Sequence, residues 1–254
     1  MTLKPYREAL ALPGIRSLLL VAILARVPVM AASVTLTLHV VFDLGRGYAA
    51  AGLVGTAVTV GAAIGAPWLG RLVDRHGLRL VLALSTVAEG VFWAAAPVLP
   101  YPALLGAAFF GGLLTLPVFS VVRQSIAAIT PVHQRRQAYA LDGMSVELSF
   151  MIGPALAVLM STTVSPRVTM LAVGGGIVLS GLALFGLNPP VRERDEEPGT
   201  AGQRIPRRQW LTSRLMTVLA ASAAATLVLG GTDVSVVALL RDAGQVKWTG
   251  VVLT

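Results

Sequence analysis

The sequence predicts an all-α fold, a polytopic bundle of helices embedded in a membrane. Of the 254 residues, 55% are hydrophobic and only 13% are charged, whereas roughly 25% of the residues in a soluble domain carry charge. The apolar residues also gather in runs about as long as the ~20 residues that a helix needs to cross a bilayer. Because such a chain has too few polar side chains to cover its surface in water, we expect lipid to surround most of it.

The apolar runs favour helices over strands. They lack the alternation of polar and apolar residues that is typical of membrane strands. A helix also satisfies its backbone hydrogen bonds internally, as hydrocarbon requires. Seven runs are long enough to form membrane spans: Ser17–Phe42, Tyr48–Leu69, Leu80–Val98, Leu104–Val122, Tyr139–Ser161, Val168–Leu187 and Leu215–Leu240.

The basic residues predict the orientation of the spans, because Lys and Arg favour the cytoplasmic side of a membrane. The net charge of +8 does not indicate a nucleic-acid partner, since the basic residues lie between apolar runs rather than along one face. We expect a plasma-membrane protein with a cytoplasmic N-terminus. The side of the N-terminus carries 15 basic residues (Lys4, Arg7, Arg16, Arg71, Arg75, Arg79, Arg123, Arg135, Arg136, Arg192, Arg194, Arg204, Arg207, Arg208 and Arg214) and the other side carries four (Arg46, Arg167, Arg241 and Lys247).

A polar, proline-rich segment divides the spans into two groups. Six spans within residues 1–187 predict an N-terminal bundle, and residues 188–213 predict a central cytoplasmic linker. The basic second half of this linker either rests on anionic headgroups or is a solvated tether. Residues 214–254 hold a seventh span and the first turns of an eighth, so we expect an incomplete C-terminal bundle, in a truncated chain or a fragment of a longer one.

The connection between the second and third spans, GRLVDRHGLRL, resembles the signature loop of the major facilitator superfamily, G-x-L-A-D-R-x-G-R-K-x-x-L. The resemblance implies the six-helix N-terminal half of a major facilitator fold plus a seventh helix. It also implies that this loop is a conformational latch, which braces one bundle against the other in the outward-facing state. The matching residues are Gly70, Leu72, Asp74, Arg75, Gly77 and Leu82; Val73 replaces alanine, Arg79 replaces lysine, and Leu78 departs from a basic residue.

The residue types in this loop predict structural roles for several of its members. We expect Gly70 to let the second helix end close to a neighbour, and Gly77 to form a tight turn with a positive φ. Asp74 can cap the third helix or pair with Arg75 or Arg79. The alternative is a short loop whose arginines only obey the positive-inside rule.

The fifth span carries a helix-packing motif. Gly153 and Pro154 match the G-x-x-x-G-P-x-x-G-G pattern of the drug/proton antiporter-like branch of the superfamily, while Ser149 and Ala157 replace glycines. Small residues at this spacing form a stripe for close contact between helices, and the proline predicts a kink. The resemblance implies an exporter; the alternative is packing alone.

The fourth span lacks another element of that branch. Proton-coupled antiporters carry R-x-x-Q-G inside this span, whereas here the span contains Pro117 and no charge. Arg123 and Gln124 lie at its cytoplasmic end instead.

Three ionisable residues lie within the predicted spans. Arg26 is nine residues into the first span, Glu89 nine into the third, and Glu147 eight into the fifth. All three spans start at the same face, so the three groups lie roughly 12–14 Å deep, the depth at which transporters place substrate and ion sites. We expect Glu147, rather than Glu89, to be the counter-ion of Arg26, because the third helix of the family lies at the periphery. Asp142 is expected at the interface. The pair either handles protons or substrate, or is a static link between helices.

These observations predict a secondary active transporter that exports small amphipathic compounds in exchange for protons by alternating access. One alternative is a non-transporting fragment or partner subunit, and another is an importer of a small metabolite. An enzyme is not expected, because the chain has no Cys, no H-E-x-x-H and no G-x-S-x-G. We expect no cofactor and no metal; the expected partners are a small-molecule substrate, protons, lipid and, in a full-length protein, the rest of the C-terminal bundle.

Overall fold

The computed structural model describes residues 4–191, 212–225 and 228. Every regular element in these ranges is helical, and six helical segments are long and apolar enough to cross a membrane. The prediction of an all-α membrane helix bundle is therefore confirmed. The chain divides into two compact units, Met1–Glu196 and Glu197–Thr254. Of the second unit, the structure describes an apolar helix, Ser213–Ala225; the rest of the predicted seventh span, the start of the eighth and most of the linker lie outside the described residues.

The first unit begins with a short helix and continues with the six membrane-spanning segments. Two of these segments end in a short turn of another helix type, π-helical in one and 3-10 in the other, and a third segment is interrupted. The elements are α1 (Lys4–Ala11), α2 (Ile15–Leu38) with the π-helical turn η1 (His39–Asp43), α3 (Tyr48–His76), α4 (Leu78–Ala95) with η2 (Ala96–Val98), α5 (Tyr101–Leu113), α6 (Val118–Ile129), η3 (Val132–Gln134), α7 (Arg135–Thr163) and α8 (Pro166–Leu187).

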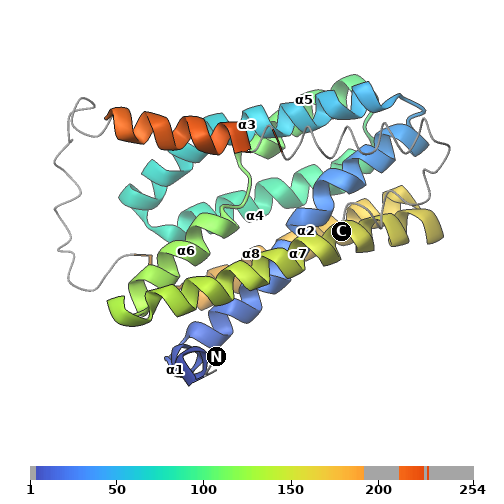
Figure 1. The fold of residues 1–254 in the computed structure, drawn as a ribbon. Coiled ribbons are helices and arrows are strands. Elements are labelled where there is room, and N and C mark those ends of the chain that lie inside the picture. Colours follow the sequence, from blue (N-terminus) through green and yellow to red (C-terminus); the bar gives the residue numbers. More distant parts are fainter. Residues whose placement is uncertain (1–3, 192–211, 226–227, 229–254) are drawn as a thin grey trace. The chain divides into compact units, whose positions relative to one another are not determined.

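Close helix pairs hold this unit together. Helix α2 packs along α7 and α8, α3 packs along α5, and α4 packs along α8 (Figure 1). Glycines make the α3–α5 contact possible: a side chain at Gly61 or Gly65 would collide with the backbone of α5. Since lipid tails supply no hydrophobic drive for helix association, such backbone contacts are what small residues contribute in a membrane.

The buried side chains form two apolar clusters with polar residues between them. The first cluster joins the starts of α2 and α4 to α6 and the end of α8, and the second joins the other ends of α2, α4 and α8 to α5. On α2, for example, the first cluster ends at Ala25 and the second begins at Ala31. We call the buried polar residues between the clusters the polar layer: Arg26, Ser85, Thr86, Glu89, Asp142, Ser145, Ser149 and Ser180.

The fourth span is broken in its middle. The sequence suggested one continuous span, but residues 114–117 are not helical and separate α5 from α6, as the short green connection in Figure 1 shows. Pro117 favours a break here, because its ring clashes with the carbonyl four residues earlier and it has no N–H to donate. It also drives the preceding residue, Leu116, away from the helical region.

The predicted latch loop is mostly helix, which corrects the sequence-based expectation. Helix α3 continues through the charged segment to His76, and Gly77 alone separates it from α4. The prediction placed the helix end where the apolar run ends, but a helix can extend into water wherever the residues favour it. A side chain at Gly70 would meet nothing, so this glycine does not serve a close contact. The N-cap residue of α4 is Gly77, which supplies no side-chain cap and has the expected positive φ, 84°.

Candidate functional site

Arg26 is the largest fully buried side chain of the described residues, and it lies in the polar layer. Its Nη1 atom lies 2.7 Å from Oδ1 of Asp142 and donates a hydrogen bond of 2.6 Å to Ser145 Oγ, so both partners lie on α7. The Asp142 contact is an ion pair rather than a directed hydrogen bond, since Oδ1 accepts none from the described residues. The guanidinium also lies 5.0 Å from the ring centre of Phe119, in the first turn of α6.

Asp142 has a second arginine near it. Arg123 Nε on α6 lies 3.8 Å from Asp142 Oδ2, and the Arg123 side chain is 63% exposed, whereas that of Asp142 is 2% exposed. The carboxylate is therefore placed between a buried arginine and an exposed one. Asp142 itself is almost fully buried, so of these three residues only Arg123 reaches the surface of the described unit.

Two donor atoms of Arg26 have no partner. Within residues 4–191, its Nε and Nη2 atoms are buried and make no hydrogen bond. A guanidinium carries five N–H donors and cannot lose its charge in a protein, and leaving a buried polar group unsatisfied is costly. This arginine can thus take a further acceptor, such as a water molecule or a ligand oxygen, without breaking the pair with Asp142.

Glu147, the expected counter-ion, is exposed and forms no ion pair with any described residue. Asp142, which was expected at the interface, takes its place. Five residues along a helix correspond to about 140° of rotation, so the two carboxylates lie on different faces of α7. Helix α7 also begins at Arg135 rather than at Tyr139, which puts Asp142 more than a turn inside the helix. The small residues that share its face were the signal that could have identified it.

Glu89 forms a separate site in the polar layer and is not paired with Arg26. Its carboxylate accepts hydrogen bonds from Trp93 Nε1 (2.9 Å), Thr115 Oγ1 (2.7 Å) and the Leu116 backbone N–H (3.4 Å). The last two donors belong to the break between α5 and α6. The carboxylate therefore satisfies a backbone N–H that the broken helix leaves free, as non-helical backbone inside a membrane requires.

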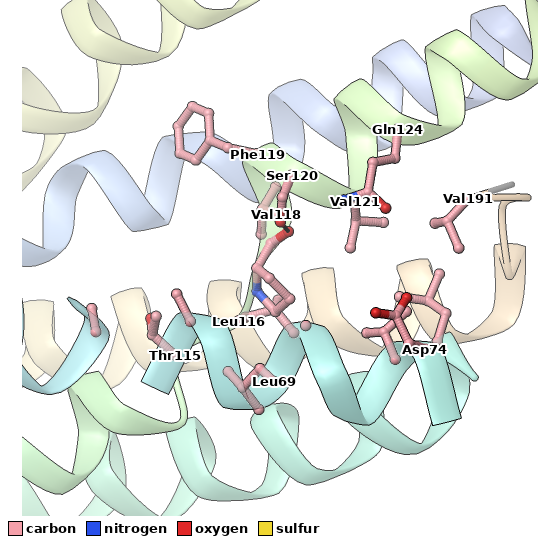
Figure 2. Close-up of a pocket in the computed structure, with 16 residues that line it drawn as sticks. Leu69, Asp74, Thr115, Leu116, Val118, Phe119, Ser120, Val121, Gln124 and Val191 are labelled. Carbon is pink, nitrogen blue, oxygen red and sulfur yellow. Dashed lines mark hydrogen bonds between the residues drawn. The ribbon is translucent and has the colours of Figure 1, made fainter. Parts of the chain in front are cut away.

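Two cavities flank this break. The larger one, about 530 Å³, lies between α3 and α6, and Asp74 and Gln124 face it from opposite sides (Figure 2). The smaller one, about 200 Å³, contains Glu89 and is lined by α2, α3, α4 and the end of α5. Thr115, which lies in the break, lines both cavities, so the break in the fourth span forms part of the wall between them.

Comparison with known proteins identifies the class. The model of the Major Facilitator Superfamily matches residues 18–252, almost the entire chain. The chain belongs to the Major Facilitator Superfamily. No curated protein and no solved structure matches it. Membership in this family, together with six helices of membrane-spanning length, makes the chain a multi-pass membrane protein of a transporter family.

The residues expected to form the latch lie along the end of α3, at Gly77 and at the start of α4. Gly70 and Asp74 line the larger cavity, while Arg75 is exposed. Arg79 lies 5.4 Å from the ring centre of Phe185 on α8, which holds it against a neighbouring helix. The structure therefore places Gly70 and Asp74 in the wall of the larger cavity, whereas Gly77 and Arg79 line another cavity that they share with Asp74.

The packing motif of the fifth span lies between α7 and α2. Ser149 and Ala157 are buried, and a side chain at Gly153 would meet Val27 O and Met30 Cβ on α2 at 2.7 Å. Pro154 lies inside α7 without interrupting it. This stripe continues the face that carries Asp142, so the close contact between the two helices also sets the distance between Arg26 and its partner.

A third charged cluster closes the other end of α2. His39 Nδ1 lies 2.7 Å from Asp43 Oδ2 within the π-helical turn, and Arg167 Nε lies 3.8 Å from the same oxygen. His39 lies near the end of the first apolar run of the sequence, where a histidine is not expected to be buried. The histidine is fully buried, however, and links α2 through Asp43 to the start of α8.

Proposed function

We propose that the chain is a secondary active transporter that exports small amphipathic compounds in exchange for protons. The observation that carries the proposal is the buried ion pair of Arg26 and Asp142 in the polar layer. An ionisable group inside a membrane is costly and marks a functional site by default. Transport would follow alternating access, in which helix bundles rock about a site near the middle of the membrane.

The pair gives the cycle a chemical step. A proton that binds the Asp142 carboxylate removes its charge and with it the attraction to Arg26, which links α2 to α7. Arg123, whose side chain is exposed, approaches Oδ2 of the same carboxylate, so we infer that a proton reaches Asp142 from the side of Arg123. Loss of the proton restores the pair, and each turnover exchanges one proton at this carboxylate.

The proposed arrangement in the membrane follows the distribution of basic residues. We place the N-terminus and residues 188–213 in the cytoplasm of a plasma-membrane protein, with residues 1–187 as one bundle and residues 214–254 as part of a second. The latch residues Asp74, Arg75 and Arg79 would brace these bundles in the outward-facing state. Support for this comes from the match of the family model to both sides of the linker.

Asp142→Asn tests the coupling, because the amide keeps the shape of the side chain and cannot exchange a proton. In vesicles that contain the complete gene product, we expect efflux of a compound panel driven by a proton gradient to be lost. Glu147→Gln, on the exposed face of α7, is the matched control and should transport normally. Proton-driven efflux by the Asn variant would overturn the role of Asp142, and gradient-driven uptake would overturn the direction.

A further inference from the structure

The cavity around Glu89 has the chemistry of a binding site for a cation. We propose that it binds the positively charged nitrogen of a small organic cation, with the carboxylate of Glu89 as the counter-charge and Phe92 and Trp93 as an aromatic wall. This inference rests on the proposed transport function and assigns the class of its substrate. Four features of the cavity favour such a ligand: the Glu89 carboxylate, the helix end beside it, the aromatic wall and the size of the cavity.

An ionised Glu89 has no counter-charge among its described neighbours. Its side chain is buried, and within residues 4–191 no Lys, Arg or His lies within ion-pair distance of it. Its three hydrogen-bond donors, an indole, a hydroxyl and an amide, are all neutral. They orient the carboxylate but supply no positive charge. A carboxylate offers about four acceptor positions, so Oε2, which accepts only from Trp93, is open to another donor.

The helix end in the wall of the cavity also favours a cation. Gly111 and Gly112, in the last turn of α5, line the cavity. The carbonyl end of a helix carries partial negative charge, and carbonyl ends of broken helices inside membranes serve as cation sites in transporters. Glu89 is the one charged side chain among the residues that line the cavity. An anionic ligand would therefore meet repulsion and no compensating charge.

Phe92 and Trp93 supply the wall against which an organic cation packs. Their rings meet edge to face, with centres 5.3 Å apart, and both line the cavity. The faces of aromatic rings attract ammonium groups. The Trp93 indole is fixed by its hydrogen bond to Glu89, and Gly111 lies close to the Phe92 ring, where a side chain would crowd it. Both rings are thus held in position before a ligand arrives.

The size of the cavity limits the ligand. About 200 Å³ is less than the ~300–1,000 Å³ of sites for drug-sized molecules. A primary amine with one small apolar group, or one such end of a larger compound, matches this volume. Metal ions prefer a shell of several oxygen ligands, and the described residues contain no cluster of three or more acidic or histidine side chains, so the organic cation is favoured.

The experiment compares a cation with a neutral molecule of the same shape. The full chain, purified in lipid nanodiscs, is titrated by calorimetry with 2-phenylethylamine and with 2-phenylethanol. We expect the amine to bind at least tenfold more tightly. Glu89→Gln should remove this preference, Phe92→Leu should weaken binding of the amine severalfold, and Glu89→Asp should restore part of the preference. Glu147→Gln is the matched control and should bind as the parent does.

Several results would overturn the inference. Equal affinity for the two probes, or an amine preference that survives Glu89→Gln, excludes the carboxylate as the counter-charge. Displacement of the amine by millimolar sodium or potassium chloride, with choline chloride inactive, would assign the cavity to a metal ion instead. Because Glu89→Gln can disturb folding, elution as a single species and an unchanged helical spectrum are required; if it fails, Phe92→Leu and Glu89→Asp decide.

Binding is measured without a proton gradient, so its outcome is separate from that of transport. Binding of the amine together with failed proton-driven efflux would leave this inference standing and remove the proposed function. Proton-driven efflux of neutral compounds, with no preference for the amine in binding, would leave the proposed function standing and remove this inference.

Discussion

Arg26 and Asp142 meet at 2.7 Å with the arginine side chain fully buried, and the pair joins the first membrane-spanning helix to the fifth. The two residues lie in the only part of the described core where polar side chains separate the two apolar clusters. The attraction within a buried ion pair is largely offset by the cost of taking both charges out of water, whereas removal of one partner leaves the other charge buried and unpaired. That asymmetry gives the first prediction.

Asp142→Ala should destabilise the protein by about 3–5 kcal/mol, the usual cost of leaving a buried charge without its partner. The double variant with Arg26→Met and Asp142→Leu should recover most of this loss, because it removes both charges and keeps apolar volume. The free energy of unfolding is measured by SDS titration in mixed micelles. A loss of less than about 1 kcal/mol for Asp142→Ala, as expected of an exposed pair, would contradict the buried arrangement.

Gly153→Ala should cost about 1–3 kcal/mol, the range for overpacking a tight contact. The added methyl group would meet the Val27 carbonyl oxygen and Met30 Cβ at 2.7 Å, and α2 would have to move away from α7. Gly143→Ala on the same helix is the matched control: its methyl group meets nothing, so stability should stay the same or rise. Equal effects of the two substitutions on unfolding would refute the close contact.

Gly77→Ala and Gly70→Ala separate the two glycines of the latch motif. Gly77 combines a φ of 84° with a ψ of 165°, a region that is almost restricted to glycine, so alanine should cost about 1–3 kcal/mol. Gly70 is helical and has open space around it, so alanine there should be neutral or slightly stabilising. Thermal unfolding of both variants in detergent provides the comparison, and a stable Gly77→Ala variant would show that the connection between α3 and α4 is not strained.

Single cysteines can test the orientation, because the native chain contains none. His76→Cys lies at the last residue of α3, beside the connection to α4, and Val164→Cys lies between α7 and α8. With the N-terminus in the cytoplasm, a membrane-impermeant maleimide added to intact cells should label Val164→Cys and leave His76→Cys unlabelled until the cells are opened. The opposite pattern would reverse the proposed topology.

The length and charge of apolar runs predicted the six spans, because the thickness of the bilayer and the cost of burying charge act on sequence directly. Arg26 was found for the same reason: a charge stands out in an apolar run. Its partner was not found, since the choice between Asp142 and Glu147 depends on which face of α7 meets α2. That face is fixed by packing at residues such as Gly153, and the apolar length of a span carries no information about it.

The break in the fourth span was not predictable from its proline alone. Pro28, Pro67 and Pro154 all lie inside uninterrupted helices, and only at Pro117 does a described span come apart. The difference lies outside the span. Glu89, on α4, accepts hydrogen bonds from Thr115 and from the Leu116 backbone, so the non-helical segment is satisfied by a residue distant in sequence.

The break at residues 114–117 has a mechanical consequence. Helix α5 is packed along α3, while α6 contacts α2 and α7. One crossing of the membrane is thus shared between two separate groups of helices, and a stretch of four residues is all that joins its halves. If the α3–α5 pair tilts against the rest, the bend is taken up at this joint, and no intact helix has to be distorted. Such a bend would also reshape the cavity that contains Glu89, because Gly111, Gly112 and Thr115 belong to its lining.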